Sequence, residues 1–299
     1  MASIVIVVTG GIVRATGSGL GCPNWPMCTD ATLAPTMAMG LHGAIEFSNR
    51  LLTGVLCVIV GWLIIAARLQ GTPSPSVLRC SWAQFWVVVL NAVVGGVTVW
   101  MRLSPYIVAA HFLAAMLLLT TAVITWDRAR RPQFPAEETA QLPRRCRTAA
   151  AWLLPVTALL VVLGTVVTGT GPHAGDSSDV ARMPFDWVLV TAIHGALAAA
   201  TLVLTALMLA ALPKGHPGPT RRRTALLLAA IVSQGLVGLL QSLTGLPSLA
   251  VVLHLLGAAL VWAGAVQVFL SARVPGAKTP SLRARADVGL RAGRVTSSS

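Results

Sequence analysis

The sequence predicts an all-α integral membrane protein whose eight transmembrane helices form two pseudo-symmetric four-helix bundles. Three observations lead to this fold class: a low content of charged residues, a series of long apolar stretches, and an internal repeat. Of the 299 residues, 55% are hydrophobic and only 10% are charged, whereas about 25% of residues are charged in a soluble domain. The mean hydropathy is +0.77. Such a chain is expected to fold in lipid.

Seven apolar stretches are long enough to cross a bilayer, which takes about 20 helical residues. An eighth stretch, Met1 to Val13, is too short to span and has neither the charged start nor the cleavage site of a signal peptide. We therefore expect a truncated first helix whose true start lies upstream of Met1. The seven long stretches are residues 41–67, 81–101, 107–126, 148–168, 188–212, 224–243 and 249–271.

Basic residues concentrate on one side of the predicted spans. Most of the 22 lysines and arginines fall between spans two and three, four and five, and six and seven, or in the tail at 272–299. The positive-inside rule then predicts a multi-pass protein of the cell membrane with both termini cytoplasmic. The net charge of +13 is explained by anionic lipid headgroups, so we expect no nucleic-acid partner. The tail is expected to be disordered.

An internal repeat relates the two halves of the chain. Gly95 precedes His111 by sixteen residues, and Gly238 precedes His254 by the same interval. Each half has an even number of spans, so the halves share one orientation and are related by an axis along the membrane normal. We expect an N-terminal half at 1–147 and a C-terminal half at 148–271.

Four histidines fall near the outer ends of spans two, four, six and eight. A lone histidine in a span commonly makes an interhelical hydrogen bond, but four at matched depth favour haem, because two imidazoles on facing helices can ligate iron from both faces. Zinc is not favoured, since no carboxylate or thiolate cluster accompanies them. The predicted pairs are His42 with His111 and His194 with His254.

Span two also carries a carboxylate and a cation on the face that holds His42. Glu46 and Arg50 have the i, i+4 spacing of an intrahelical ion pair. An alternative, compatible with the first, is that Glu46 transfers protons while Arg50, beside Asn49, holds a haem propionate.

The cysteines follow the predicted topology. Cys22 and Cys28 lie in the first outer loop, on the oxidising side, where they could form a disulfide. Cys57, Cys80 and Cys146 lie in a span or at the cytoplasmic side and are interpreted as structural thiols.

Three motifs resemble the haem A synthase family. The segment GGIVRATGSGLGCPNWPMC at 10–28 is similar to the family signature, and EFSNR at 46–50 and GTGPHAGD at 169–176 also match. The resemblance covers roughly residues 4–271. It implies an enzyme that oxidises one methyl group of haem O to a formyl group, by successive hydroxylations and loss of water, to make haem A for cytochrome oxidase.

The resemblance also implies a division of labour between the halves. His194 and His254 would hold a haem b cofactor, while the substrate haem O would bind near His111 and Glu46, the expected catalytic residues. Relatives commonly have a histidine directly before the arginine of span two, where this chain has Asn49. His42, two helical turns earlier, is expected to replace it as ligand to the substrate iron.

Further expectations concern the binding partners and the residues outside the two haem sites. A haem O synthase, an unidentified electron partner, membrane lipid and a second copy of the chain are the expected partners. The Cys22 and Cys28 pair resembles one that influences electron or haem handover in relatives, although a disulfide that braces the loop explains it equally well. His173 ranks below the span histidines, and His216 is expected to be solvated. Rival functions are an electron-carrying b-type cytochrome and a transporter.

Overall fold

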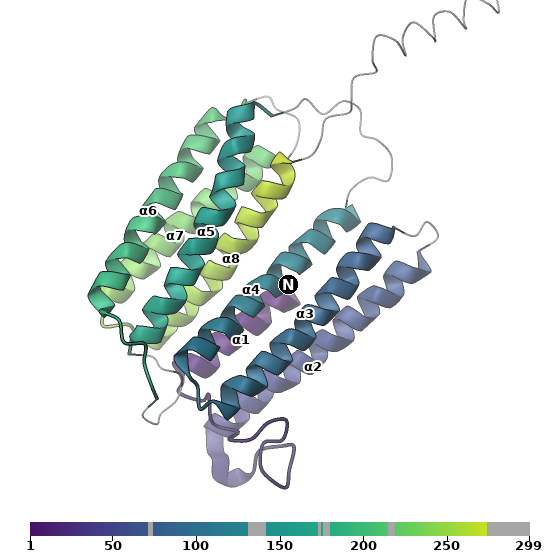
Figure 1. The fold of residues 1–299 in the computed structure, drawn as a ribbon, viewed down its shortest axis with the longest axis vertical. Helices are drawn as coiled ribbons and strands as arrows, with labels where there is room; N and C mark the ends of the chain where they lie inside the picture. The colour runs from purple at the N-terminus through teal and green to yellow at the C-terminus, as the bar shows by residue number, and fades with distance from the viewer. Residues whose placement is uncertain (71–73, 131–141, 173–174, 176–179, 215–218, 274–299) are drawn as a thin grey trace, which may run out of the picture.

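The computed structural model describes residues 1–299 apart from 71–73, 131–141, 173–174, 176–179, 215–218 and 274–299 (Figure 1). The described residues form α-helices and one short 3-10 helix, with no strand among them. The helices are α1 (Ala2–Ala15), η1 (Met37–Met39), α2 (Gly40–Leu69), α3 (Pro75–Trp100), α4 (Pro105–Arg130), α5 (Arg144–Thr170), α6 (Trp187–Ala211), α7 (Thr220–Leu243) and α8 (Ser248–Ala272).

Seven helices, α2 to α8, are long and apolar enough to cross a membrane, which confirms the seven predicted spans. The first helix, α1, has 14 residues and is shorter than a span, as its sequence indicates. The observed helices run a little past the apolar stretches; α4, for example, ends at Arg130, because basic residues continue the helix beyond the hydrocarbon. The predicted tail lies outside the described residues.

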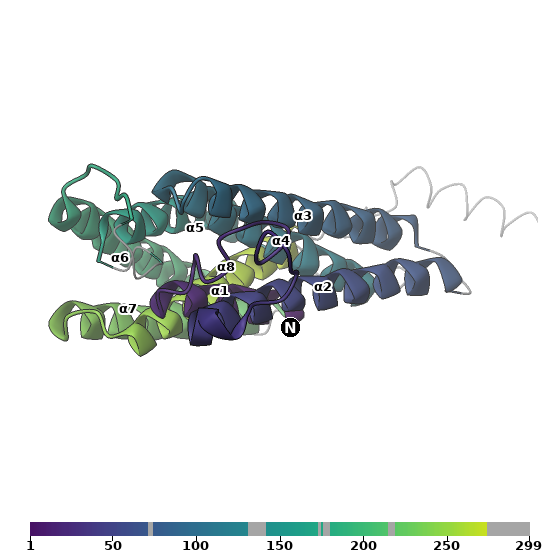
Figure 2. The ribbon, with the colours of Figure 1, turned by 90° about the horizontal axis from the view of Figure 1, so that it is seen from below.

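The helices pack in two rings. In the first, α1 contacts α2 and α4, while α3 contacts α2 and α4; in the second, α5 contacts α6 and α8, while α7 contacts α6 and α8. Among the described residues, α2 does not touch α4 and α6 does not touch α8, so these helices stand at opposite corners of their rings. Figures 1 and 2 show the two groups side by side.

Each group of helices has its own apolar core, and a third core joins them. Val60, Val88 and Leu118 are buried between α2, α3 and α4, and a larger cluster around Leu153 and Met208 fills the other group. Val7, Met116, Leu119 and Ala259 form the third cluster, where α1 and α4 meet α8. The Trp262 indole N–H on α8 donates to the Met116 carbonyl of α4 at 3.0 Å. Packing and a hydrogen bond thus connect the two groups.

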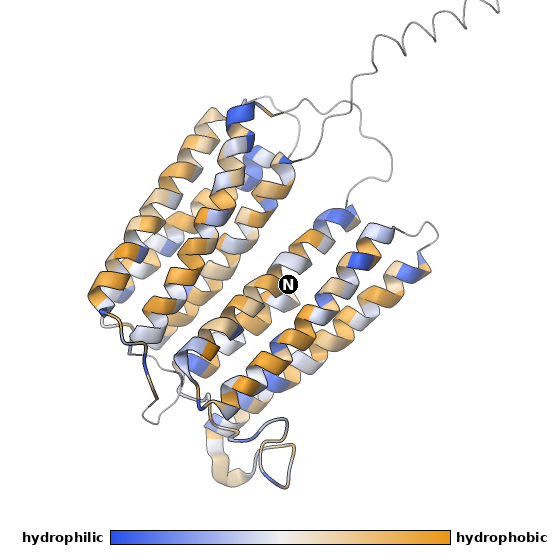
Figure 3. Cartoon of the chain, in the orientation of Figure 1, coloured by the Kyte–Doolittle hydropathy of each residue, from blue (hydrophilic) through white to orange (hydrophobic). Residues whose placement is uncertain are grey.

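The outer surface of the helices suits a lipid environment. Apolar residues cover most of the helical surface, and polar residues gather towards the helix ends and loops (Figure 3). Buried hydroxyls satisfy their hydrogen bonds locally: Thr157, Thr201 and Thr224 each donate to the carbonyl four residues earlier. Polar groups in hydrocarbon must be satisfied within the protein, and these three hydroxyls meet that requirement.

Candidate functional site

Three of the four predicted histidines have the same local setting. Each lies six or seven residues inside its helix and places its imidazole against a glycine of a neighbouring helix. An ideal Cβ on Gly95 would lie 3.1 Å from Cε1 of His111, and one on Gly238 would lie 3.5 Å from Cε1 of His254. The same construction on Gly164 gives 3.2 Å to Cε1 of His194. A Cβ at Gly95 or Gly164 would therefore crowd the imidazole that it faces, whereas one at Gly238 would make an ordinary van der Waals contact.

The same three histidines each have a buried nitrogen without a partner. Nδ1 of His111, His194 and His254 makes no hydrogen bond among the described residues. A buried polar atom left unsatisfied costs about 1–3 kcal/mol, so a group that engages these imidazoles would offset that penalty. His194 lies on α6 and His254 lies on α8. Their helices stand at opposite corners of one ring, an arrangement that fits a haem held between two imidazoles.

His42 differs from the other three. It is exposed, lies two residues from the start of α2, and its Nδ1 is 2.9 Å from the Ser18 hydroxyl. A hydrogen bond at Nδ1 leaves Nε2 available, which is the usual arrangement for a metal-binding histidine. His42 and His111 stand on the diagonal helices α2 and α4, and whether they act as a pair stays a prediction.

The predicted ion pair on α2 is confirmed, and it has a second role. Arg50 donates to the Glu46 carboxylate, whose other oxygen accepts the backbone N–H of Cys22 at 2.7 Å. Glu46 is only 5% exposed, so this pair is largely shielded from solvent. Arg50 also donates to the carbonyls of Cys22 at 2.9 Å, Asn24 at 2.9 Å and Met27 at 3.1 Å. The pair thus fastens the first outer loop to α2.

The outer loop is closed by a disulfide and packs tightly on two helices. Cys22 and Cys28 are bonded to each other, which confirms the predicted pairing, and both are fully buried. Gly21 lies directly against the His42 backbone, where no Cβ would fit. The Trp25 ring covers Gly96 of α3 and meets Trp100 edge to face at a centroid distance of 5.3 Å. Cys57, Cys80 and Cys146 are free thiols, as predicted.

Two motifs that are far apart in the sequence meet at the end of the helix bundle that carries the disulfide loop. Arg14, in the first motif, donates to the Thr168 carbonyl at 2.9 Å, and the Gly19 N–H donates to the Gly175 carbonyl at 2.8 Å. The first contact joins the ends of α1 and α5, and the second joins the segments that follow these helices. The sequence offered no signal for this meeting beyond the shared glycines. His173 and His216, also singled out above, lie outside the described residues.

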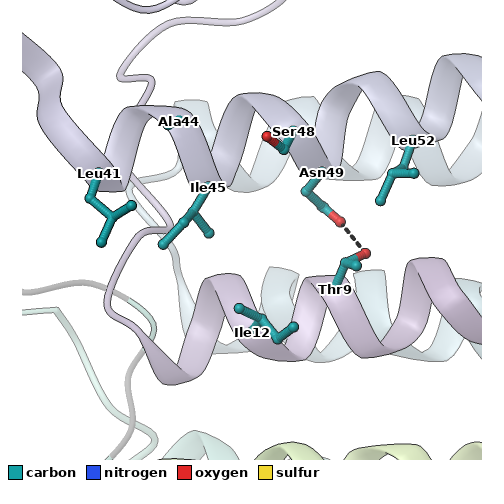
Figure 4. Close-up of a pocket in the computed structure, with 8 residues that line it drawn as sticks. All are labelled: Thr9, Ile12, Leu41, Ala44, Ile45, Ser48, Asn49 and Leu52. Atoms are coloured by element: carbon teal, nitrogen blue, oxygen red, sulfur yellow. Dashed lines mark hydrogen bonds between the residues drawn. The ribbon is translucent and has the colours of Figure 1, made fainter. Parts of the chain in front are cut away.

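Asn49 faces α1 at the edge of the first ring. Its Oδ1 accepts a hydrogen bond from the Thr9 hydroxyl at 2.8 Å (Figure 4). The bond lies in a groove of about 320 Å³ between α1 and α2, which the sequence did not predict. The groove is lined by Thr9, Ile12, Leu41, Ala44, Ile45, Ser48, Asn49 and Leu52.

Fold and site together define a class: a multi-pass helical membrane protein with imidazoles set into glycine-lined helix contacts near one surface. Within that class, the chain belongs to the COX15-CtaA family, described as cytochrome oxidase assembly protein, whose model matches residues 1–266.

Similar proteins carry a more specific name. A heme A synthase of Geobacillus thermodenitrificans is 29% identical over 47% of this chain, and the match spans 46% of that relative. One of Staphylococcus saprophyticus is 25% identical over 62% of this chain and 68% of its own length. One of Rhizorhabdus wittichii is 27% identical over 87% of this chain and 89% of its own length. The first of these matches thus spans less than half of its relative, whereas the third is nearly full-length.

Proposed function

We propose that this protein is a haem A synthase, an enzyme that oxidises one methyl group of haem O to a formyl group for the assembly of cytochrome oxidase. The observation that carries the proposal is the family match over residues 1–266. The nearly full-length similarity to a heme A synthase supports the same activity. Three imidazoles with unpartnered nitrogens supply the ligands that an enzyme acting on haem needs.

The two rings form pseudo-symmetric bundles in this proposal, with domains at 1–147 and 148–271. Equivalent helices have equivalent neighbours in the two rings. Polar contacts recur as well: the Asn91 amide donates to the Ala114 carbonyl at 3.0 Å, and the Gln234 amide packs on Gly257. Both pairs are separated by 23 residues in the sequence. These repeated contacts favour two bundles that arose from one ancestral unit.

The C-terminal bundle holds a resident haem b through His194 and His254. The supporting evidence is their unpartnered nitrogens and their glycine neighbours. When bound, this haem supplies one-electron transfer without an open coordination position. The protein itself excludes water from this site and holds the imidazole rings of His194 and His254 at opposite corners of one bundle.

The N-terminal bundle receives haem O. His111, beside Gly95, is the main candidate ligand to the substrate iron, and His42 is the second. Glu46 is the candidate acceptor for a proton released at the methyl group. Its carboxylate is held by Arg50 and by the Cys22 N–H, so it stays in one orientation. Arg50 already donates to Glu46 and to three loop carbonyls, which supports a role in shaping the chamber more than one in binding a propionate.

The orientation and partners follow from the basic residues and the chemistry. We place both termini in the cytoplasm, so that the histidines and the disulfide loop face the outer side of the cell membrane. A haem O synthase would supply the substrate, and an unidentified electron partner would take part in each oxidation. A second copy of the chain remains a candidate partner.

Pigment extraction from cells tests the proposal. The protein is expressed with a supply of haem O and purified, and its haems are extracted and separated. We expect haem b together with newly formed haem A. Haem b without conversion of haem O would leave only an electron-carrying cytochrome, and absence of any haem would contradict both functions.

A further inference from the structure

We propose that the groove between α1 and α2 binds the isoprenoid tail of haem O and thereby determines which porphyrin methyl group is oxidised. This inference rests on the proposed function and adds the recognition of one part of the substrate. Haem O differs from haem b by a long isoprenoid tail, joined to the macrocycle through a carbon that bears a hydroxyl group. A site for this substrate must therefore accommodate a flat ring, a polar junction and an apolar chain.

The size and lining of the groove fit the chain. At about 320 Å³, the groove lies at the lower end of ligand sites, which occupy about 300–1,000 Å³. It has room for a slender chain and not for a porphyrin. Ile12 of α1 and Leu41, Ile45 and Leu52 of α2 form its apolar walls (Figure 4). Such walls match the shape of an apolar chain and exclude polar groups from the groove.

The polar residues of the groove fit the junction. Thr9 and Asn49 face one another across it, joined by their 2.8 Å hydrogen bond, and Ser48 lies beside them in the lining. A hydroxyl and an amide can both accept and donate hydrogen bonds, so they can receive the substrate hydroxyl. Asn49 is also three residues after Glu46 on α2, and side chains at that spacing are neighbours on a helix. One residue of the groove lining is thus a helical neighbour of the proposed catalytic carboxylate.

Membrane energetics decides what such a groove can achieve. Lipid tails are as apolar as the groove walls, so moving an isoprenoid chain from lipid into the groove gains little hydrophobic free energy. A free lipid acyl chain has no further advantage there. The tail of haem O does have an advantage over free lipid. In the proposed complex His111 holds the macrocycle, so the effective concentration of the attached tail at the groove is high. The groove thus favours the tethered tail over free lipid.

The consequence concerns orientation. A porphyrin held only by axial imidazoles can rotate about the iron–imidazole axis and present different edges to Glu46. A tail seated between α1 and α2 removes this freedom, so that one methyl group faces the carboxylate. Fixing a reactant in one orientation is an established source of rate and selectivity.

Blocking the groove tests this proposal by haem binding as well as by turnover. Ile45→Trp fills the groove, and Leu51→Trp is the matched control, because Leu51 is 56% exposed on the same helix outside the groove lining. The purified holoprotein in phospholipid nanodiscs is titrated with haem O and, separately, with additional haem b, which lacks the tail. We expect Ile45→Trp to weaken haem O binding about tenfold, because a blocked groove denies the substrate hydroxyl its hydrogen bonds with Thr9 and Asn49, and to leave binding of the added haem b unchanged. Leu51→Trp should change neither.

Three results would overturn the inference: equal loss of affinity for both haems, no loss for either, or the same loss in Leu51→Trp. Retention of the resident haem b reports correct folding of each variant. If Ile45→Trp does not retain it, Ile12→Trp blocks the opposite wall and is judged by the same comparison. A wild-type protein that binds haem O through the groove but forms no haem A would contradict the proposed function and leave the groove intact.

Discussion

Helices α2 and α6 carry the same His-Gly-Ala triplet, at 42–44 and 194–196, yet the polar residues of α2 have hydrogen-bond partners where those of α6 lack them. On α2, His42, Glu46, Asn49 and Arg50 all have hydrogen-bond partners among the described residues. On α6, the Nδ1 of His194 and the hydroxyl of Thr191 have none. Gly43 of α2 lies beneath the disulfide loop, whereas a Cβ on Gly195 of α6 would meet nothing within 4 Å among the described residues.

This difference indicates how one bundle design serves two purposes. A helix whose polar groups are already satisfied forms a fixed wall, as a reaction chamber needs. A helix with an unsatisfied imidazole has a ligand position to fill, as a resident cofactor needs. The predictions below separate the two bundles by perturbing one at a time.

The largest effect is expected from Arg50→Gln. The substitution leaves the Glu46 carboxylate buried without its cation, and breaking a buried pair in this way costs about 3–5 kcal/mol. The loop also loses three carbonyl contacts. We expect faster reduction of the Cys22–Cys28 disulfide by a soluble thiol, and loss of haem A formation with haem b retained. Loss of haem b would show that the two bundles are not independent. Arg68→Gln, at the opposite end of α2, is the control and should behave as wild type.

Removing the disulfide should have a smaller effect. Replacing both Cys22 and Cys28 by serine frees a short loop, which corresponds to about 2 kcal/mol of chain entropy. Arg50 and the Cys22 N–H still hold the loop, so we expect reduced thermal stability and a partial loss of haem A formation. Complete loss of activity with unchanged stability would instead assign the cysteines a chemical role.

A glycine substitution tests the C-terminal bundle alone. In Gly238→Leu the larger side chain crowds the His254 ring, because even a Cβ at Gly238 would already lie 3.5 Å from Cε1 of His254. An overpacking strain of about 1.4 kcal/mol would lower haem affinity about tenfold. The control is Gly235→Leu on the same helix, where a Cβ meets nothing within 4 Å. The haem b absorbance of the purified proteins measures the effect. Equal absorbance in the two variants would contradict the assigned position of His254.

The smallest effect is expected at the contact between the bundles. Trp262→Phe keeps an aromatic side chain but removes the indole N–H that donates to the Met116 carbonyl and the Thr120 hydroxyl. The loss is worth about 1 kcal/mol and should lower the thermal midpoint slightly. Haem b content should not change; if it falls with the midpoint, this contact supports the cofactor site directly.

The spans and the histidine positions could be predicted because they depend on local pattern. Apolar stretches of sufficient length must be helical in lipid, and the sixteen-residue interval from Gly95 to His111 recurs at Gly238 and His254. The interval indicated only a repeat; the structure adds that each of these glycines packs against the histidine that follows it. Gly164, opposite His194, had no such repeat to mark it.

The outer loop contacts could not be predicted, because they depend on tertiary packing. The spacing of Glu46 and Arg50 indicated an ion pair, but nothing in it indicated that Arg50 also reaches three carbonyls of the first loop. The contact of Arg14 with Thr168 depends on how α1 and α5 are placed around α4 and α8. The α1–α2 groove likewise arises where two helices diverge, and no residue pattern records that divergence.

Haem analysis of single histidine variants tests the non-equivalence of the bundles most directly. His111→Ala, His194→Ala and His254→Ala are each purified after expression with a supply of haem O, and their haems are extracted and quantified. The account predicts that His111→Ala retains haem b and forms no haem A, while His194→Ala and His254→Ala lose haem b. Loss of haem b in His111→Ala, or its retention in both of the other variants, would contradict it.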